Sequence, residues 1–446
     1  MDAMTDKWGE PLTTASADAA ESFAAGVQAL ATLIGDPQRS ADCAIVADPE
    51  FILARCLAAY VRLYPMTGQS RNDSKDILAG LSGREDWIDL RTRMHLKAAR
   101  AWVAGDLKGA IGQLEQVLLA HPRDLLAAKV VQDLYLFIGD SVNLRDSINR
   151  IFFSWPSDLP GYSDFLGMRS FGLEETYSFE QGEALGRQAL SLDPGNVYAR
   201  HSVTHVCEML GRRREGIDFL LGSENDWGGS FSKIHLWWHL SLMYLDEGEY
   251  GKAKRVYDNL LCGTRPVVMH DIADRASLLW RFYLLGQDVS DSAPALGEDA
   301  QPFAGDSTYV FNEFHLVICE VLAGRPSGAE SVLERMESRS SDLNDGRLVN
   351  EVGIPFCRGL ICFAAQDYSE AARLVSSIRH RSTELGGSHA QQDIVFQTAL
   401  VAAGAAGHEG LTRALTAERV LTRPNSESTT ARLVAAGREW RDRRPS

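Results

Sequence analysis

A turn signal recurs along this chain, each time at the end of an apolar segment with helical periodicity. The steps between successive signals run from 33 to 42 residues. A period in the mid-thirties is typical of stacked helix–turn–helix units, each of which buries its apolar face only against its neighbours. The signals fall at Gly35, Gly68, Gly105, Gly139, Tyr177, Gly211, Gly248, Gly286, Gly324, Gln366, Gly404 and Gly437. The spacing therefore predicts a chain of helical hairpins.

The residues that follow these turns agree with a two-helix repeat. The turns at Gly105 and Tyr177 each lie 17 residues before a proline, Pro122 and Pro194. A proline ends a helix because it lacks the backbone N–H that the helix needs. Runs with strand-like alternation of apolar and polar residues are sparse, so the sequence predicts an all-α protein.

The predicted boundaries give one long repeat region between two less regular ends. We expect a frayed N-terminus over residues 1–20, a single α-solenoid over 21–425, and a C-terminal helix with a charged tail over 426–446. Two polar stretches, 290–305 and 338–347, are predicted to be loops because they are rich in Ser and Asp.

Composition narrows the classes of partner and the compartment. The 446 residues are 45% hydrophobic and carry a net charge of −15, which argues against nucleic acid or an anionic membrane as the main partner. The polar N-terminus does not resemble a secretory signal, and no apolar stretch is long enough to span a bilayer. Scattered cysteines without a paired pattern indicate reduced thiols and a cytoplasmic protein; they are Cys43, Cys56, Cys207, Cys262, Cys319, Cys357 and Cys362.

Two histidine pairs are the strongest sign of chemistry. His201 and His205 are four residues apart, as are His235 and His239, so each pair lies on one face of its helix. Glu208 follows the first pair on the same face. Imidazole and carboxylate groups in this arrangement can bind a metal or act as an acid–base pair.

Several segments resemble those of one family, the tetratricopeptide repeat protein thirty-eight family. They are Phe137 to Asp140, Leu144 to Ser147, Ser170 to Thr176, His201 to Met209, His235 to Leu240, Phe311 to His315 and Leu385 to Asp393. The resemblance covers roughly residues 90 to 400 and implies a soluble helical-repeat fold, but no activity that could be transferred. With it we expect a right-handed superhelical solenoid of about ten to twelve hairpins. The first 60 residues and the stretch near 290–305 depart from the family pattern.

The resemblance also implies which residues line a concave groove. In a tetratricopeptide unit the turn residue is position 15, and positions 2, 5, 9 and 12 of the first helix face the groove. Counting back from Gly211 and Gly248 puts His201, His205 and Glu208, together with His235 and Trp238, at groove positions and His239 beside them. His315 and the segment His389 to Asp393 begin later first helices and are candidates for the opposite wall.

Three interpretations of this groove remain open. The histidines can form a structural polar seam between helices, contact a bound peptide, or build a site for a small molecule or metal. The first functional hypothesis is a protein that binds a peptide or small ligand through His201, His235, Trp238, His315, His389 and Asp393. The alternative is an enzyme in which His205, Glu208 and His239 are catalytic and His201, His205, His235 and His239 hold zinc or iron. Asp271, Asp274, Arg275 and Arg281 are interpreted as structural ion pairs near the groove.

Overall fold

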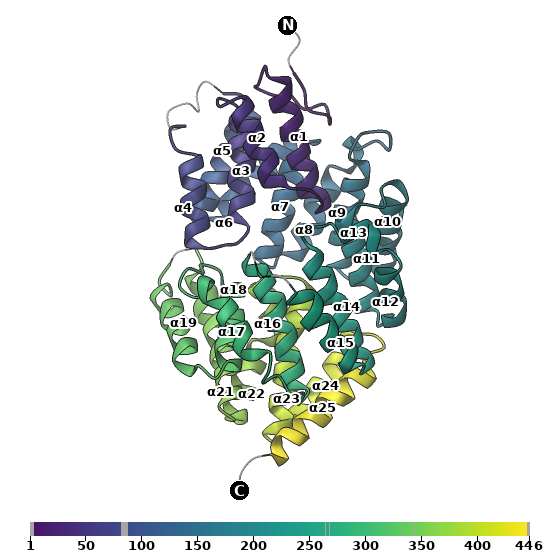
Figure 1. Ribbon diagram of the computed structural model, residues 1–446, viewed down its shortest axis with the longest axis vertical. Coiled ribbons are helices and arrows are strands. Elements are labelled where there is room, and N and C mark those ends of the chain that lie inside the picture. The colour runs from purple at the N-terminus through teal and green to yellow at the C-terminus, as the bar shows by residue number, and fades with distance from the viewer. Residues whose placement is uncertain (1–3, 82–87, 264, 267, 343, 444–446) are drawn as a thin grey trace. The chain divides into compact units, whose positions relative to one another are not determined.

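The computed structural model describes residues 4–81, 88–263, 265–266, 268–342 and 344–443. The chain divides into two compact units, each described below by itself. Unit 1 comprises Met1–Val206 and Ser223–Lys233, and unit 2 comprises Cys207–Gly222 and Ile234–Ser446. Helices account for nearly all regular structure in both units (Figure 1). The described residues contain no strand, only one isolated bridge between Thr5 and Pro11, so the predicted all-α class is confirmed.

Unit 1 is built from consecutive helices that pack as pairs, for example α1 with α2, α5 with α6 and α9 with α10. Its helices are α1 (Ala17–Thr32), α2 (Pro37–Ala47), α3 (Ile52–Leu63), α4 (Gly68–Ile77), α5 (Leu90–Val103), α6 (Leu107–Ala120), α7 (Leu125–Phe137), α8 (Ser141–Arg150), η2 (Phe152–Ser154), α9 (Tyr162–Glu174), α10 (Phe179–Leu192) and α13 (Glu224–Trp227). Helix α11 (Val197–Met209) begins in unit 1, and its last residues belong to unit 2.

Unit 2 repeats the pairing, with α18 against α19, α21 against α22 and α23 against both α24 and α25. Its helices are α12 (Arg213–Leu221), α14 (Lys233–Glu247), α15 (Tyr250–Val256), η3 (Tyr257–Leu261), α16 (Met269–Leu284), α17 (Ala293–Ala300), η4 (Gln301–Phe303), α18 (Val310–Leu322), α19 (Pro326–Ser338), α20 (Gly346–Leu348), η5 (Val349–Gly353), α21 (Ile354–Ala364), α22 (Tyr368–Ile378), η6 (Arg379–Leu385), α23 (His389–Ala405), α24 (Glu409–Thr422) and α25 (Glu427–Asp442). Whether residues 21–425 form one right-handed superhelix stays a prediction.

The predicted turns have a common geometry. The turn residue has a positive φ, between 63° and 101°, at Gly35, Gly105, Gly139, Tyr177, Gly211, Gly248, Gly286, Gly324 and Gln366. This left-handed conformation ends a helix by letting its last carbonyls bond to the turning backbone. Where an aspartate follows, as at Asp106 and Asp140, its side chain accepts a hydrogen bond from an N–H in the first turn of the next helix. The Gly–Asp pair therefore ends one helix and begins the next.

Three of the predicted turns are wrong. Gly68 is the first residue of α4, and the left-handed residue is Met66. Gly404 lies inside α23, one residue before its end, and the turn is at Gly407. Gly437 lies inside α25. A Cβ on Gly404 would lie 3.2 Å from the Cα of Gly437, so these two glycines let α23 and α25 approach closely instead of making turns.

Two other predicted boundaries also differ. The stretch predicted as a loop at 290–305 contains α17, because Ala293, Leu296, Gly297 and Ala300 recur at helical spacing and are buried. Residues 4–16, predicted to be frayed, are packed: Trp8 is 1% exposed and Asp6 pairs with the buried Arg91 at 3.0 Å. Residues 1–3, at the start of the predicted frayed end, and 444–446, at the end of the predicted charged tail, lie outside the described residues.

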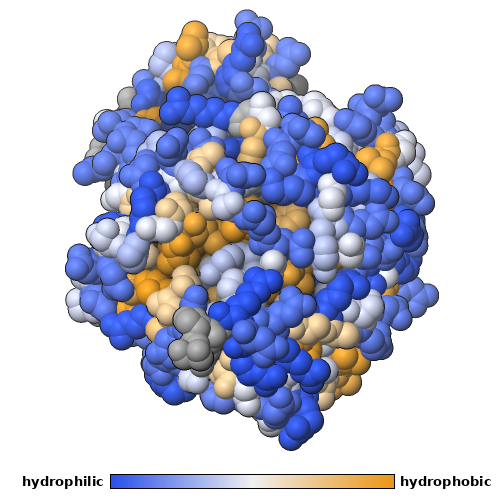
Figure 2. All heavy atoms as spheres, turned by 60° about the horizontal axis from the view of Figure 1, so that its bottom comes forward, coloured by the Kyte–Doolittle hydropathy of each residue, from blue (hydrophilic) through white to orange (hydrophobic). Residues whose placement is uncertain are grey.

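The surface is described by its hydropathy. The face drawn in Figure 2 is mostly hydrophilic, with apolar side chains gathered in a few patches. All seven cysteines are free thiols, and four of them are buried. Among the described residues, no helix combines the length and the apolar composition needed to cross a membrane.

The close approach of α23 and α25 gives a stability prediction. A Cβ on Gly437 would lie 2.8 Å from the carbonyl oxygen of Val401, and backbone cannot move aside cheaply. We expect Gly437→Val to lower the free energy of unfolding by about 1–3 kcal/mol in urea denaturation. Gly410→Ala, in α24 of the same unit and with nothing within 4 Å of the added Cβ, should be as stable as wild type or slightly more so. Equal midpoints for all three proteins would contradict the packing of these helices.

Candidate functional site

Helix α14 presents three aromatic groups on one buried face. His235, Trp238 and His239 follow one another at i, i+3 and i+4 and are 7%, 0% and 0% exposed. The indole N–H of Trp238 donates to the hydroxyl oxygen of Ser277 on α16 at 2.9 Å. The Trp238 ring stacks on His235, with centroids 5.2 Å apart and planes 11° apart. This face of α14 is therefore held rigidly against α16.

His239 is oriented by a carboxylate. Its Nδ1 lies 2.8 Å from Oε2 of Glu208, which is 5% exposed and belongs to the part of α11 in unit 2. A carboxylate accepts this hydrogen bond from Nδ1–H and so fixes the imidazole tautomer. Two of the three predicted catalytic residues, Glu208 and His239, are thus in direct contact.

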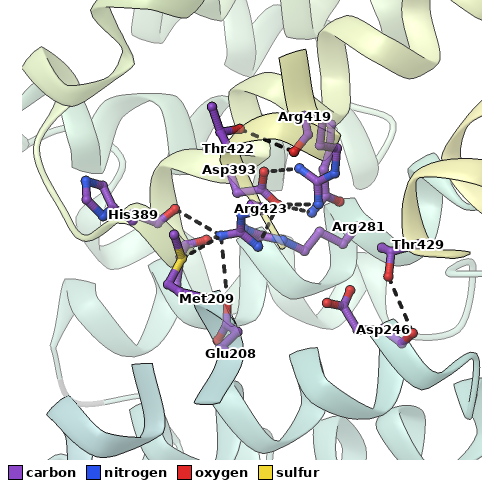
Figure 3. A network of polar contacts seen from close by, with 12 residues as sticks. Glu208, Met209, Asp246, Arg281, His389, Asp393, Arg419, Thr422, Arg423 and Thr429 are labelled. Carbon is purple, nitrogen blue, oxygen red and sulfur yellow. Dashed lines mark hydrogen bonds and ion pairs between the residues drawn. The ribbon is translucent and has the colours of Figure 1, made fainter. Parts of the chain in front are cut away.

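Glu208 begins a buried network of charges that continues into α23 and α24 (Figure 3). Its Oε1 is 4.0 Å from Arg423, and Arg423 is 3.4 Å from Asp393. Both oxygens of Asp393 also pair with Arg419. Burial alone would raise the pKa of Asp393, but the two guanidinium groups outweigh it and hold this pKa well below its usual range. Asp393, predicted as a ligand contact, is already saturated with protein partners.

Arg281 differs from the other arginines of this network. Its guanidinium donates to the carbonyl oxygens of Ser277 and Ala390, both at 2.9 Å, and lies 5.5 Å from the centre of the Trp238 ring. It is 2% exposed, and within the described part of the chain no carboxylate forms an ion pair with it. Burial lowers the pKa of Arg281 to about 10, and the carboxylates of Asp393 and Glu208 offset this only in part.

A small cavity adjoins Arg281. Its volume of about 20 Å³ admits one water-sized group. Arg432, which is half-buried, forms part of its wall. The lining residues come from α11, α14, α16, α23 and α25 and the turn before α25: Glu208, Leu242, Leu245, Asp246, Arg281, Leu285, Ala390, Asp393, Gln397, Arg423, Thr429, Arg432 and Leu433.

The two later histidines of the prediction have different environments. His315 is 2% exposed, and its Nδ1–H donates to the carbonyl oxygen of Phe311 at 2.8 Å. Burial lowers the pKa of His315 to about 3, so the imidazole is neutral at physiological pH. His389 is the first residue of α23, where Ser388 and Gln391 form a capping box, and its carbonyl oxygen lies 3.4 Å from Arg423.

The first histidine pair lies in unit 1 beside two carboxylates. Nε2 of His201 and Nε2 of His205 are 2.9 Å apart, and Nδ1 of His205 is 3.3 Å from Glu174 and 3.5 Å from Glu175. Burial opposes a charge on His205, but the carboxylates prevail and raise its pKa. The pKa of Glu174 is raised by burial and by Glu175. These groups therefore share protons instead of titrating independently.

The predicted four-histidine metal site takes two residues from each unit and stays a prediction. Three residues of unit 2 were missed by the prediction: Arg419 and Arg423 in the charge network, and His270, whose Nε2 lies 3.9 Å from Oδ1 of Asp274. Their signals were present: Arg419 and Arg423 are four residues apart, as are His270 and Asp274. No pattern in the sequence indicated which distant helix these pairs would face.

No family model matches the sequence. Among solved structures, a tetratricopeptide repeat protein from Parabacteroides merdae is similar at 12% identity over 69% of this chain and 98% of that chain, with a TM-score of 0.33.

The pairing of Asp393 predicts a large effect of its removal. Asp393→Asn leaves Arg419 buried without its counter-charge, so we expect a loss of about 3–5 kcal/mol in the free energy of unfolding. The double variant Asp393→Leu/Arg419→Met should recover most of it, because the buried charges are then gone together. Glu370→Gln, which removes an exposed pair with Arg373, should leave the urea midpoint unchanged. An Asp393→Asn midpoint equal to that of wild type would show that the network does not form.

The low pKa of His315 predicts a pH-dependent stability. Below about pH 6.5 the unfolded chain protonates this histidine, whereas the folded protein resists until about pH 3. The folded state therefore loses stability as the pH falls through this window, by about 2 kcal/mol at about pH 5. His315→Gln keeps a donor for the Phe311 carbonyl but does not titrate. We expect the drop in unfolding free energy between about pH 7.5 and about pH 5 to be smaller in the variant by that amount; equal drops would contradict the assignment.

Proposed function

We propose that this helical-repeat protein belongs to the tetratricopeptide repeat protein thirty-eight family, as the sequence segments suggest, and that it binds a carboxylate-bearing peptide or small molecule. Unit 2 would receive the carboxylate at Arg281. The net charge of −15 argues against nucleic acid as the ligand.

One observation carries the proposal: Arg281 is a buried guanidinium without an ion pair in the described part of the chain. A buried charge without an ion pair costs several kcal/mol. Burial lowers the pKa of Arg281, and the neighbouring carboxylates compensate for it only in part. The carboxylates that act on Arg281 have other partners: Asp393 pairs with Arg419, Glu208 with His239, and Asp246 with Arg213. An anionic group of a ligand would supply the counter-charge that Arg281 lacks.

The cavity beside Arg281 limits how the ligand would bind. It has room for one small polar group and not for a whole metabolite. One oxygen of a terminal carboxylate would occupy it, and the rest of the ligand would stay outside, beyond the half-buried Arg432. Arg281 and Arg423, both lining the cavity, would donate to that oxygen in charge-assisted hydrogen bonds.

The enzyme hypothesis remains the second candidate. The 2.8 Å hydrogen bond between Glu208 and His239 favours it, since a carboxylate-oriented imidazole is suited to general acid–base catalysis. His205, the third candidate catalytic residue, belongs to unit 1 and would take part only if the two units bring it near Glu208 and His239. Turnover of a small molecule by protein that binds no carboxylate would favour this candidate over the first.

The carboxylate hypothesis is tested by Arg281→Met. At constant ionic strength, succinate and peptides with a free C-terminal carboxylate should raise the melting temperature of wild-type protein, whereas succinamide and C-terminally amidated peptides should not. The variant should lose this response. Without ligand, it should be no less stable than wild type, because replacing a poorly paired buried charge by an apolar group is often neutral or stabilising.

A matched control is Arg347→Met, which removes an arginine of unit 2 that is 82% exposed. It should respond to the carboxylates as wild type does. Equal responses of wild type and Arg281→Met, or no response from wild type, would refute the binding site.

A further inference from the structure

Three metal-ligating side chains meet between α14 and α16 in unit 2. His270 and Asp274 are four residues apart on α16 and so lie on one face, opposite His235 of α14. Nδ1 of His235 is 3.0 Å from each oxygen of Asp274, and Nε2 of His270 is 3.9 Å from Oδ1 of Asp274. One ligand atom from each residue lies within 4.8 Å of the other two.

These distances suit a small divalent cation. Ligand atoms at about 2.0–2.1 Å from a tetrahedral zinc ion lie about 3.3 Å apart. The distance from Asp274 to His235, 3.0 Å, is slightly shorter than this value, and the distance from Asp274 to His270, 3.9 Å, is slightly longer. His235 and Asp274 are buried, whereas the side chain of His270 is 47% exposed. Two ligands are therefore held in place, and the third has the freedom to close on the ion.

The surroundings hold His235 in position. Its ring stacks on Trp238, which is anchored to Ser277, and packs edge-on against His239 at 4.7 Å between centroids. Supporting contacts of this kind fix ring orientation in metal sites. On binding an ion, the proton of the hydrogen bond between Nδ1 of His235 and Asp274 would leave to solvent or be replaced by one on Nε2, and Nδ1 and the carboxylate would each form a bond to the metal instead.

We propose that unit 2 binds one divalent transition-metal ion, in the first place zinc, through His235, His270 and Asp274. Two imidazoles and one carboxylate occupy three positions and leave at least one open, as in sites where a metal binds water or a substrate. This set shares only His235 with the four histidines predicted from the sequence. It does not depend on the carboxylate hypothesis, although Trp238 contacts both His235 and Arg281.

The test uses full-length protein freed of metal with a chelator and titrated with zinc chloride by calorimetry. We expect one zinc ion per wild-type chain. His270→Ala and Asp274→Asn should each weaken binding by at least about 100-fold, since even the loss of a supporting contact costs 10–100-fold. Cobalt(II) should give the visible spectrum of a low-coordinate nitrogen and oxygen site in wild type and lose it in both variants.

Melting temperatures and two further variants distinguish loss of this site from unfolding and from zinc binding elsewhere in the chain. His270 is exposed, so His270→Ala should keep the wild-type melting temperature of the metal-free protein, which separates ligand loss from unfolding. His408→Ala, an exposed histidine of unit 2 outside the cluster, should bind zinc like wild type. Zinc binding that survives His270→Ala but is lost in His201→Gln would overturn the proposal in favour of the four-histidine set, and a wild-type chain that binds no zinc would refute it outright.

Discussion

Each helical hairpin of this protein depends on a turn in which one residue adopts a left-handed backbone conformation. At Gly105 and Gly139 the glycine ends the first helix, and the following aspartate caps the second. Without that conformation the second helix cannot fold back, and the apolar faces of the two helices stay exposed to water. Since each pair buries its core against the next, the local turn determines the position of every residue that follows.

The turns were predictable from the sequence because their chemistry is local. Gly211 and Gly248 end their helices where the repeat places them, so the burial of His235 and His239 on one helix face follows from the spacing. Gly404 was wrongly predicted to be a turn residue. Glycine also occurs where two helices pack closely, and a single sequence does not distinguish these two roles. The prediction of a loop at 290–305 was wrong for a related reason, because small residues of this stretch pack as helix α17.

The candidate site was predictable only in part. Helical phasing placed Glu208 at a groove position of one repeat and His239 beside the groove positions of the next repeat. The side chains of these two residues are in contact. Phasing does not indicate which remote helix supplies the partners, so the contact of Arg419 with Asp393 was missed. His270 was missed because it lies outside the groove positions that the family resemblance implies. Contacts between repeats far apart in sequence depend on how the hairpins stack, which small differences in packing decide.

The buried charges of unit 2 differ in how they are neutralised. Asp274, Arg281, Asp393 and Arg419 are all less than 10% exposed, and apolar residues of similar size are often at least as stabilising in such positions. Asp393 and Arg419 neutralise each other. Arg281 is not neutralised in this way, and this difference is the reason why we propose Arg281, and not Arg419, as the group that receives a ligand.

Trp238 links the two proposed sites physically. One contact of its ring is the guanidinium of Arg281, 5.5 Å from the centroid, and another is the stacked imidazole of His235. A divalent cation bound at His235, His270 and Asp274 would add positive charge near the same indole. Both charges act in a buried environment, where screening by water is weak. An anion bound at Arg281 would therefore be attracted by the metal as well, and by thermodynamic reciprocity its binding would strengthen that of the metal. The aromatic face of α14 would then couple the two sites without any movement of the helices.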